Sequence, residues 1–445
     1  MKRDLLRFKS VKLRELAKKI DLIEKKNSNL ENAQNVYFPT FSDSIGLFQI
    51  FRLFKFKVNH YNFYLKIMKN TLSGIFFSCS KIYKNKKKFN YNNIIFTWAN
   101  YKNFNQNGSL DDRYFNINSR RTQSTLWIVI YLDSKIPKTL DKNILLYKNE
   151  KKKIKILKFV NFIIKKIFSF KNFSLFFHNI SNFSFFGNNF LKDIKVYLKP
   201  EIKKIFFPFE YQPFQNRLIY YLKIMTNNNT KVIGYIHAPP LSFPSNYIHR
   251  RVSPDEIIVN GDDQATCFKK FLNWPDKKIR VKPSTRFLKN KKISMSNNIY
   301  FPMTIRNEKD IYDSFTYIIN SSNYCLNGIK IKKHPISAKE KKIIKFEKKL
   351  EKLLSSEKKK KIKNTKNLSI FIGSTGAIIE ALERGTKVLQ ICEFPLLDVY
   401  SNELWKNIVV NRIAKNIFTY KLKKKGRLIR LGDSQKRKTL YGYKI

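Results

Sequence analysis

The chain has 445 residues, with 89 Lys and Arg against 32 Asp and Glu, which gives a formal net charge of +57. Its 43% apolar residues, among them 39 Phe and 23 Tyr, provide far more buryable surface than a disordered chain carries, and 13 Gly with 14 Pro exclude a collagen-like or linker protein. This length allows about two or three domains. The four cysteines form no CxxC pair, so the sequence predicts neither a disulfide framework nor a zinc site; they are Cys79, Cys267, Cys325 and Cys392. We expect a reducing compartment.

The positive charge comes mainly from lysine, in a chain that is also rich in Asn, Ile, Phe and Tyr. Such a composition is typical of proteins encoded by AT-rich genomes, whereas a selected nucleic-acid surface favours arginine, which makes bidentate contacts. Three interpretations of the charge stay open. They are compositional drift with solubility, attraction to an anionic membrane at about 1 kcal/mol per lysine, and nucleic-acid binding.

Two segments of the N-terminal half bear on targeting. Residues 1–29 are charged and have helical apolar periodicity, unlike a signal peptide. Residues 154–190 are rich in Phe, but lysines interrupt them, so that no run approaches the ~18 apolar residues needed to span a membrane. We interpret this stretch as buried core, with docking on a membrane surface as the alternative.

Short apolar runs rich in β-branched and aromatic residues predict buried strands along most of the chain. These runs are 91–98, 125–132, 231–236, 256–259, 278–281, 298–301, 328–332, 368–372 and 387–391. Helices are predicted through Cys267 and Phe271, over 310–320 and over 377–384. A capping box of Ser337 and Glu340 predicts the start of a further helix, whose apolar stripe includes Ile343, Phe346 and Leu350. The alternation from about 230 to 425 predicts one parallel sheet with helices on both faces.

Two loops that follow predicted strands carry candidate ligands for an anion. Gly373-Ser374-Thr375-Gly376 comes directly before a helix, where hydroxyls and free N–H groups suit a phosphate, although capping of the helix is the alternative. His334 follows the strand over 328–332. It is suited to donate to a phosphate or to transfer a proton, and a merely solvent-exposed histidine is the alternative. Both loops are expected at the carboxyl edge of the sheet, where open α/β folds bind ligands.

Glu210 and His237 also lie at strand ends, and a carboxylate and an imidazole that converge can do general-base work. The chain contains no GxGxxG, Walker A or HExxH motif. Their absence argues against a dehydrogenase, an NTPase or a zinc protease.

Several motifs together resemble known families. Lys332-Lys333-His334-Pro335, followed by 373–376 and by Glu380-Ala381-Leu382, resembles the His-Pro and Ser-Ser/Thr motifs of bacterial GT-B glycosyltransferases that use CMP-activated sugars. These are sialyl-, polysialyl- and Kdo-transferases, with CDP-glycerol glycerophosphotransferases as relatives. Residues 107–115, 125–133, 207–212 and 234–237 resemble a bacterial family of surface carbohydrate biosynthesis proteins. The resemblance consists of short islands between about residues 90 and 410.

The resemblance implies an α/β, GT-B-like fold of two Rossmann-like domains facing a cleft. The implied organisation is a helical N-terminal segment over 1–89, an acceptor-side domain over 90–249, a nucleotide-sugar-binding domain over 250–425 and a basic tail over 426–445. The implied activity is metal-independent transfer of a sugar from a nucleotide donor, CMP-linked, to a glycan or lipid-linked acceptor. It implies no cofactor and no specific nucleic-acid partner. The expected location is the cytoplasm, with peripheral association with the inner membrane.

The resemblance also implies roles for single residues. His334, Ser374 and Thr375 would hold the nucleotide phosphates, and Arg286 would neutralise donor charge. Glu380 would face the ribose or the sugar, while Glu210 or His237 would face the acceptor. The full set of candidate site residues is Glu210, His237, Arg286, His334, Ser374, Thr375 and Glu380.

One departure from these families keeps two alternatives open. Sialyltransferases carry an acidic Asp/Glu-Asp/Glu-Gly motif for the base, and this chain has only an inverted version at 260–263. The chain would then be a non-catalytic GT-B-fold paralogue that serves as a binding or scaffold module in surface carbohydrate assembly. A basic nucleic-acid-binding protein is the other alternative, and an affinity that falls steeply with salt would favour it.

Overall fold

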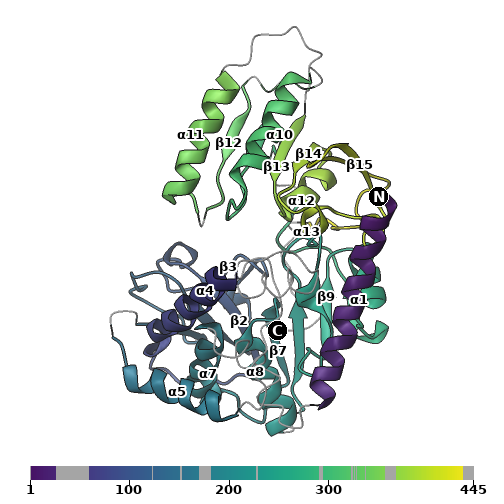
Figure 1. Ribbon diagram of the computed structural model, residues 1–445. Coiled ribbons are helices and arrows are strands. Elements are labelled where there is room, and N and C mark those ends of the chain that lie inside the picture. The colour runs from purple at the N-terminus through teal and green to yellow at the C-terminus, as the bar shows by residue number, and fades with distance from the viewer. Residues whose placement is uncertain are drawn as a thin grey trace.

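The computed structural model describes residues 2–26, 60–122, 124–150, 153–169, 182–226, 229–289, 294–321, 324, 326, 328–335, 337–355 and 367–433. Its strands form two large sheets, each flanked by helices, and a short two-stranded sheet. We call residues 60–289 the first lobe and 294–422 the second lobe (Figure 1). The mixed α/β fold predicted from the sequence is confirmed.

The first lobe is built on an eight-stranded sheet, parallel except for its edge strand β1. In spatial order its strands are β1 (Ser80–Lys84), β6 (Ile144–Asn149), β5 (Thr125–Tyr131), β2 (Asn93–Ala99), β7 (Lys204–Pro208), β8 (Lys231–Tyr235), β9 (Glu256–Val259) and β10 (Ile279–Val281). The helices that come before or between these strands are α4 (His60–Ser73), η1 (Gly74–Phe77), α5 (Ile156–Ser169), α7 (Asn182–Ile194), α8 (Pro213–Tyr220), the π-helical η5 (Tyr221–Met225) and α9 (Asp262–Phe271). The small sheet pairs β3 (Asp111–Asp112) with β4 (Ile117–Asn118).

The second lobe is built on a six-stranded sheet. Its spatial order is β12 (Lys330–Lys332), β11 (Asn298–Tyr300), β13 (Leu368–Ile372), β14 (Lys387–Ile391), β16 (Ile417–Leu422) and β15 (Ile408–Ala414). The first four strands are parallel, and β16 and β15 add an antiparallel hairpin. Its helices are α10 (Glu308–Asn320), α11 (Lys341–Ser355), α12 (Ala377–Glu383) and α13 (Pro395–Asp398).

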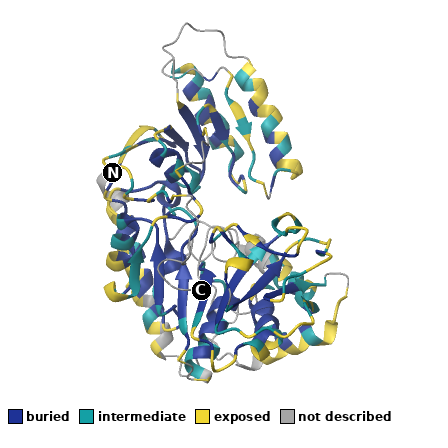
Figure 2. Cartoon of the chain, turned by 180° about the vertical axis from the view of Figure 1, so that it is seen from behind, coloured by how far each residue is buried: buried dark blue, intermediate teal, exposed yellow. Residues whose placement is uncertain are grey.

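Both faces of the first sheet are covered by apolar packing, as expected for a parallel sheet (Figure 2). Successive side chains of a strand point to opposite faces, and in β2 Ile94 and Phe96 enter one core whereas Ile95 and Ala99 enter the other. The strands predicted at 91–98 and 125–132, which the structure places at 93–99 and 125–131, are therefore nearly continuous apolar runs.

Two segments tie the lobes together. Helix α1 (Lys2–Lys26) contacts α9 of the first lobe and α13 of the second, and Lys9 Nζ, which is buried, donates a 2.6 Å hydrogen bond to the carbonyl of Val399 (Figure 1). Residues 427–432 return to the first lobe, where a Cβ on Gly261 would lie only 2.3 Å from the Leu428 carbonyl oxygen. Glycine at 261 thus permits the close approach of the returning chain.

Three predictions need correction. Residues 230–425 do not form one parallel sheet, because β8, β9 and β10 belong to the eight-stranded sheet and β15 and β16 are antiparallel. The expected boundary at 249/250 consequently falls inside the first lobe. The capping box is also wrong, since α11 begins at Lys341 and Ser337 Oγ is buried with no hydrogen-bond partner among the described residues.

The other strands and helices that the sequence predicted are present, with bounds that differ by only a few residues. The stripe of α11 buries Ile343, Phe346 and Leu350 as predicted. The lysine run 358–361 and residues 170–181 of the Phe-rich stretch lie outside the described residues, as do 434–445 of the basic tail. Among the helices that the structure describes, none is long and apolar enough to cross a membrane.

Candidate functional site

The polar residues at the carboxyl edges of the two sheets meet in a cavity of about 640 Å³, which we call the inter-lobe pocket. His237 reaches it from the end of β8, Arg286 from the loop after β10, and His334 from the loop after β12 in the second lobe. The other lining residues are Asp111, Asp112, Arg113, Tyr114, Asn116, Thr285 and Leu288. Three of the seven predicted site residues therefore line one pocket of a size usual for small ligands.

His237 and Glu210 converge beside this pocket, which is the condition that the sequence analysis set for general-base work by this pair. His237 Nε2 lies 3.3 Å from Glu210 Oε1, and His237 Nδ1 is buried without a hydrogen-bond partner among the described residues. The ring of Tyr114 stands edge-on to the imidazole, with centroids 4.7 Å apart. The imidazole is held by ring packing on one side and faces a carboxylate on another.

Burial sets the protonation of this pair. Desolvation, followed by the positive charges of Arg286 and Arg113, lowers the pKa of His237 to about 3, so the imidazole is neutral near pH 7. Burial raises the pKa of Glu210 above its usual value, while a hydrogen bond from Gln212 and the charge of Arg286 act in the opposite direction. A neutral imidazole can present an Nε2–H to Glu210. Glu210, with its raised pKa, is then the better proton acceptor of the two.

The loop between β3 and β4 is rigidly built around Asp112. This buried carboxylate accepts hydrogen bonds from the backbone N–H groups of Tyr114 at 2.8 Å and Phe115 at 2.6 Å, and from the hydroxyl of Thr97. Burial raises the pKa of Asp112 to about 6. Thr285 Oγ1 donates to the Tyr114 carbonyl at 2.7 Å and so joins this loop to the loop that carries Arg286.

The cationic groups of the pocket differ in their availability. Arg113 and Arg286 are both exposed to solvent. Arg113 Nη2 donates a hydrogen bond to the Tyr114 hydroxyl at 3.1 Å, and the Arg286 guanidinium lies over the ring of Phe287. His334 is half-buried, and burial lowers its pKa, so it is mainly neutral near pH 7. The permanent positive charge of this pocket therefore comes from the two arginines, and the carboxylates of Asp111 and Asp112 line it as well.

Ser374 and Thr375 lie at the carboxyl edge of the second sheet but do not line the inter-lobe pocket. The Ser374 hydroxyl is 2.9 Å from that of Ser242, and Tyr400 donates to the Thr375 carbonyl at 3.2 Å. A Cβ on Gly376 would lie 3.1 Å from Pro239. The turn 373–376 thus packs against 239–242, the segment that follows His237, and its polar atoms help to join the lobes.

Glu380 and the inverted acidic motif also have partners inside the protein. Arg384 Nε donates to Glu380 Oε1 at 3.0 Å, and both side chains are largely buried. Asp262 forms ion pairs with Arg427 at 3.0 Å and Arg430 at 2.6 Å. Asp262 therefore fastens the returning chain to α9 and is not among the residues that line the pocket.

The sequence missed the contribution of the loop 111–116. Its one signal was the charged-aromatic cluster in residues 107–115, which carried no expected role. His237, Arg286 and His334 could be identified because each follows a predicted strand. The loop 111–116 belongs to the two-stranded sheet of β3 and β4 instead, so the same reasoning did not identify it.

Comparison with known proteins adds nothing to this description, because no protein-family model and no curated protein sequence matches the chain. Within the ranges that the structure describes, no three His, Cys, Asp or Glu side chains are grouped so that they could hold a metal ion. The functional argument therefore depends on the geometry of the inter-lobe pocket.

Proposed function

We propose that this protein is an enzyme of the GT-B glycosyltransferase type. It transfers a sugar from a CMP-linked nucleotide donor to a glycan or lipid-linked acceptor in bacterial surface polysaccharide synthesis. One observation carries the proposal. Side chains from the carboxyl edges of two parallel-rich sheets, His237 and Arg286 from one and His334 from the other, line a single cavity. Ligands of open α/β folds bind at such edges.

The pocket supplies two kinds of chemistry that the reaction needs. Departure of a nucleotide leaves negative charge on phosphate, and Arg113, Arg286 and a hydrogen-bonding His334 would stabilise that charge. Glu210 would accept the proton of the acceptor hydroxyl, while neutral His237 holds the carboxylate in place at 3.3 Å. Ser374, Thr375 and Glu380 have structural roles in this proposal, because they contact Ser242, Tyr400 and Arg384 within the protein.

A specific observation favours a second candidate, the non-catalytic binding module. Two residues implied as donor ligands, Ser374 and Glu380, are engaged with Ser242 and Arg384. A chain with this architecture could bind a nucleotide and transfer nothing. The binding module predicts saturable nucleotide binding without turnover of a nucleotide sugar.

A thermal-shift screen of CMP, CDP, UDP and GDP tests the proposal. A nucleotide present at 100 times its Kd stabilises the fold by about 2.7 kcal/mol, which raises the melting temperature measurably. We expect a cytidine nucleotide to give the largest shift, and CMP-sugar hydrolysis followed by release of CMP to separate the enzyme from the binding module. No shift with any nucleotide would contradict both candidates.

We propose further that the protein works on an anionic membrane surface, which it meets through α5. Ile156 and Leu157 are 60% and 79% exposed, Ile164 is 43% exposed, and Lys153 and Lys155 flank the helix. Apolar side chains beside lysines are the composition of interfacial helices. Leu157→Asp should release the protein from phosphatidylserine vesicles in a sedimentation assay, whereas Val196→Asp, at a site of similar exposure on η4 (Lys195–Tyr197), should not.

A further inference from the structure

A second cavity, of about 550 Å³, lies at the same edge of the first sheet and has no part in the proposed transfer. We call it the aromatic pocket. Residues at the ends of β2, β5 and β6 line it together with η1 and α7: Phe77, Trp98, Ile130, Tyr131, Leu132, Asp133, Ser134, Lys148, Asn149, Glu150, Phe183, Phe186 and Gln212. Its place at the carboxyl ends of parallel strands is the position in which open α/β sheets bind ligands.

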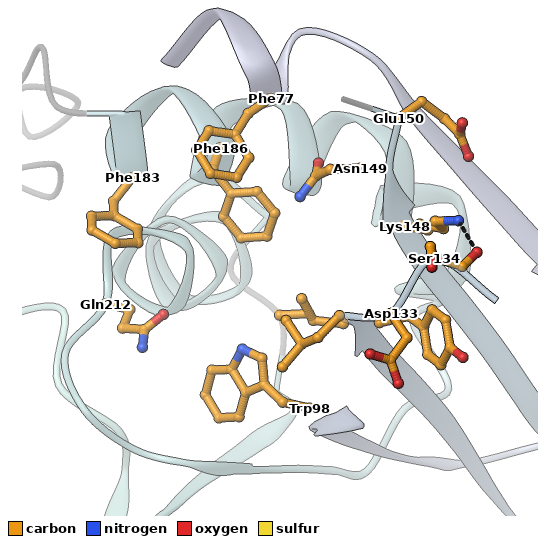
Figure 3. Close-up of a pocket in the computed structure, with 13 residues that line it drawn as sticks. Phe77, Trp98, Asp133, Ser134, Lys148, Asn149, Glu150, Phe183, Phe186 and Gln212 are labelled. Atoms are coloured by element: carbon orange, nitrogen blue, oxygen red, sulfur yellow. Dashed lines mark hydrogen bonds between the residues drawn. The ribbon is translucent and has the colours of Figure 1, made fainter. Parts of the chain in front are cut away.

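The two sides of this pocket differ in chemistry. Figure 3 shows the rings of Phe77, Phe183 and Phe186 on one side and Asp133 with Lys148 on the other. An occupant that matches both sides has an apolar body and polar groups at its opposite end. The aromatic rings supply area for burial, at roughly 25 cal/mol per Å² of apolar surface removed from water.

Several polar groups of the pocket are available for a ligand. The indole nitrogen of Trp98 is turned toward the cavity (Figure 3) and makes no hydrogen bond among the described residues. The amide group of Asn149 also borders the cavity (Figure 3), with its nitrogen toward the cavity and the buried Oδ1 turned away from it. A polar group that faces the cavity gains free energy when a ligand bonds to it. Hydroxyl and amide groups, which both donate and accept, fit this pair of atoms.

The charged residues of the pocket are mainly acidic, whereas the protein as a whole is strongly basic. The ionisable residues of the pocket are two carboxylates, Asp133 and Glu150, against one amine, Lys148, in a chain of formal charge +57. Asp133 Oδ2 accepts from the Tyr101 N–H at 2.6 Å, and Lys148 Nζ donates to the Ser134 carbonyl at 2.8 Å, so both ends of the rim are held in place. Figure 3 shows the Glu150 carboxylate turned away from the cavity, where it accepts a hydrogen bond from the Tyr83 hydroxyl at 3.2 Å, so an anion that enters would face the Asp133 carboxylate. The pocket therefore favours an uncharged ligand.

We propose that the aromatic pocket binds an uncharged amphipathic molecule, with an alkyl or aryl body against Phe183 and Phe186 and with hydroxyl or amide groups at Trp98, Asn149 and Asp133. This inference goes beyond the proposed transfer. The two pockets nevertheless touch, because the ring of Trp98 contacts that of Tyr114 at 5.6 Å between centroids, and Tyr114 packs on His237. An occupant of the aromatic pocket lies next to the inter-lobe pocket.

The fluorescence of Trp98 provides a direct test with hexyl β-D-glucopyranoside as the probe. Of the four tryptophans, Trp127, Trp274 and Trp405 are buried and only Trp98 is partly exposed. Hexyl glucoside, added below its micellar concentration in 150 mM NaCl, should change the tryptophan emission saturably, and Trp98→Phe should abolish that change. Glucose, which lacks the apolar body, should have no effect at the same concentration.

Selectivity and variants complete the test. Hexyl sulfate should bind at least tenfold more weakly than hexyl glucoside, and Asp133→Asn should reduce that difference. Phe183→Ala should weaken binding of hexyl glucoside at least fivefold, whereas Val196→Ala, at an exposed site outside the pocket, should leave it unchanged. If Phe183→Ala lowers the melting temperature, Phe183→Leu replaces it in the binding measurement. Equal binding of the two probes, an emission change that survives Trp98→Phe, or no saturable change would overturn the proposal. Nucleotide binding is not involved, so these failures are distinct from a failure of the proposed transfer.

Discussion

Gln212 Nε2 donates a 2.8 Å hydrogen bond to Glu210 Oε2, and this contact joins the aromatic pocket to the inter-lobe pocket. Gln212 lines the aromatic pocket, while Glu210 lies 3.3 Å from His237, which lines the inter-lobe pocket. The carboxylate is thus held from both sides. A group fixed in this way keeps its orientation when a ligand arrives, which is what a proton acceptor needs.

The protonation of His237 is open to direct measurement. Because burial and the two nearby arginines lower its pKa to about 3, the imidazole should stay neutral down to pH 5, well below the ordinary value of 6.5. Nuclear magnetic resonance of histidine-labelled protein, with His237→Gln used to assign the signal, should show a single neutral form between pH 5 and 8. A midpoint near 6.5 would contradict the environment described for this residue.

The same shift predicts how acid affects stability. The folded protein has the lower pKa, so the unfolded chain binds more protons between about pH 3 and 6.5, and stability contributed by neutral His237 falls as the pH drops through this window. The slope from this one group approaches roughly 1.4 kcal/mol per pH unit. Urea unfolding at pH 5 and 7 should therefore show a smaller difference for His237→Gln than for the unaltered protein.

Glu210→Gln separates proton transfer from nucleotide binding. The amide keeps the shape of the side chain but cannot accept a proton, so turnover of a CMP-sugar should fall about 10²- to 10⁴-fold with nucleotide affinity nearly unchanged. Glu403→Gln is the matched control, since Glu403 is exposed in the second lobe. Equal turnover of Glu210→Gln and the unaltered protein would remove Glu210 from the reaction.

Ser374→Ala tests whether the turn 373–376 joins the lobes or binds phosphate. The variant loses the 2.9 Å contact with Ser242, and the loss of one hydrogen bond typically costs about 0.5–1.5 kcal/mol. We expect a lower melting temperature and a nucleotide affinity within twofold of the unaltered protein. A tenfold loss of affinity at unchanged stability would return Ser374 to the nucleotide site.

Much of the fold was predictable because buried parallel strands are recognisable in the sequence as apolar runs. The run predicted at 91–98, which forms β2 over 93–99, and the run at 368–372 are examples. The membership of β9 and β10 in the first sheet was not predictable, since alternation of strands and helices is the same on either side of a domain boundary. The hairpin of β15 and β16 was missed because its turn, Lys415-Asn416, lacks the glycine that usually marks a tight hairpin turn.

The site was predictable where it depends on strand ends and not where it depends on partners. His237, Arg286 and His334 follow predicted strands, and all three line one pocket. Ser374 also follows a strand, yet its hydroxyl is taken up by Ser242, a residue far away in the sequence. Hydrogen bonds between distant segments are set by packing, which no local pattern records.

The affinity of Arg286→Ala for CMP tests the central claim most directly. Isothermal titration of the unaltered protein should give saturable binding of CMP. Arg286→Ala should weaken it about ten- to a hundredfold, because a hydrogen bond to a charged group is worth about 1.5–3 kcal/mol. Arg412→Ala removes the same charge on the edge strand β15 and should leave the affinity unchanged. If the unaltered protein does not bind CMP, or if both variants bind it equally well, the inter-lobe pocket is not the nucleotide site.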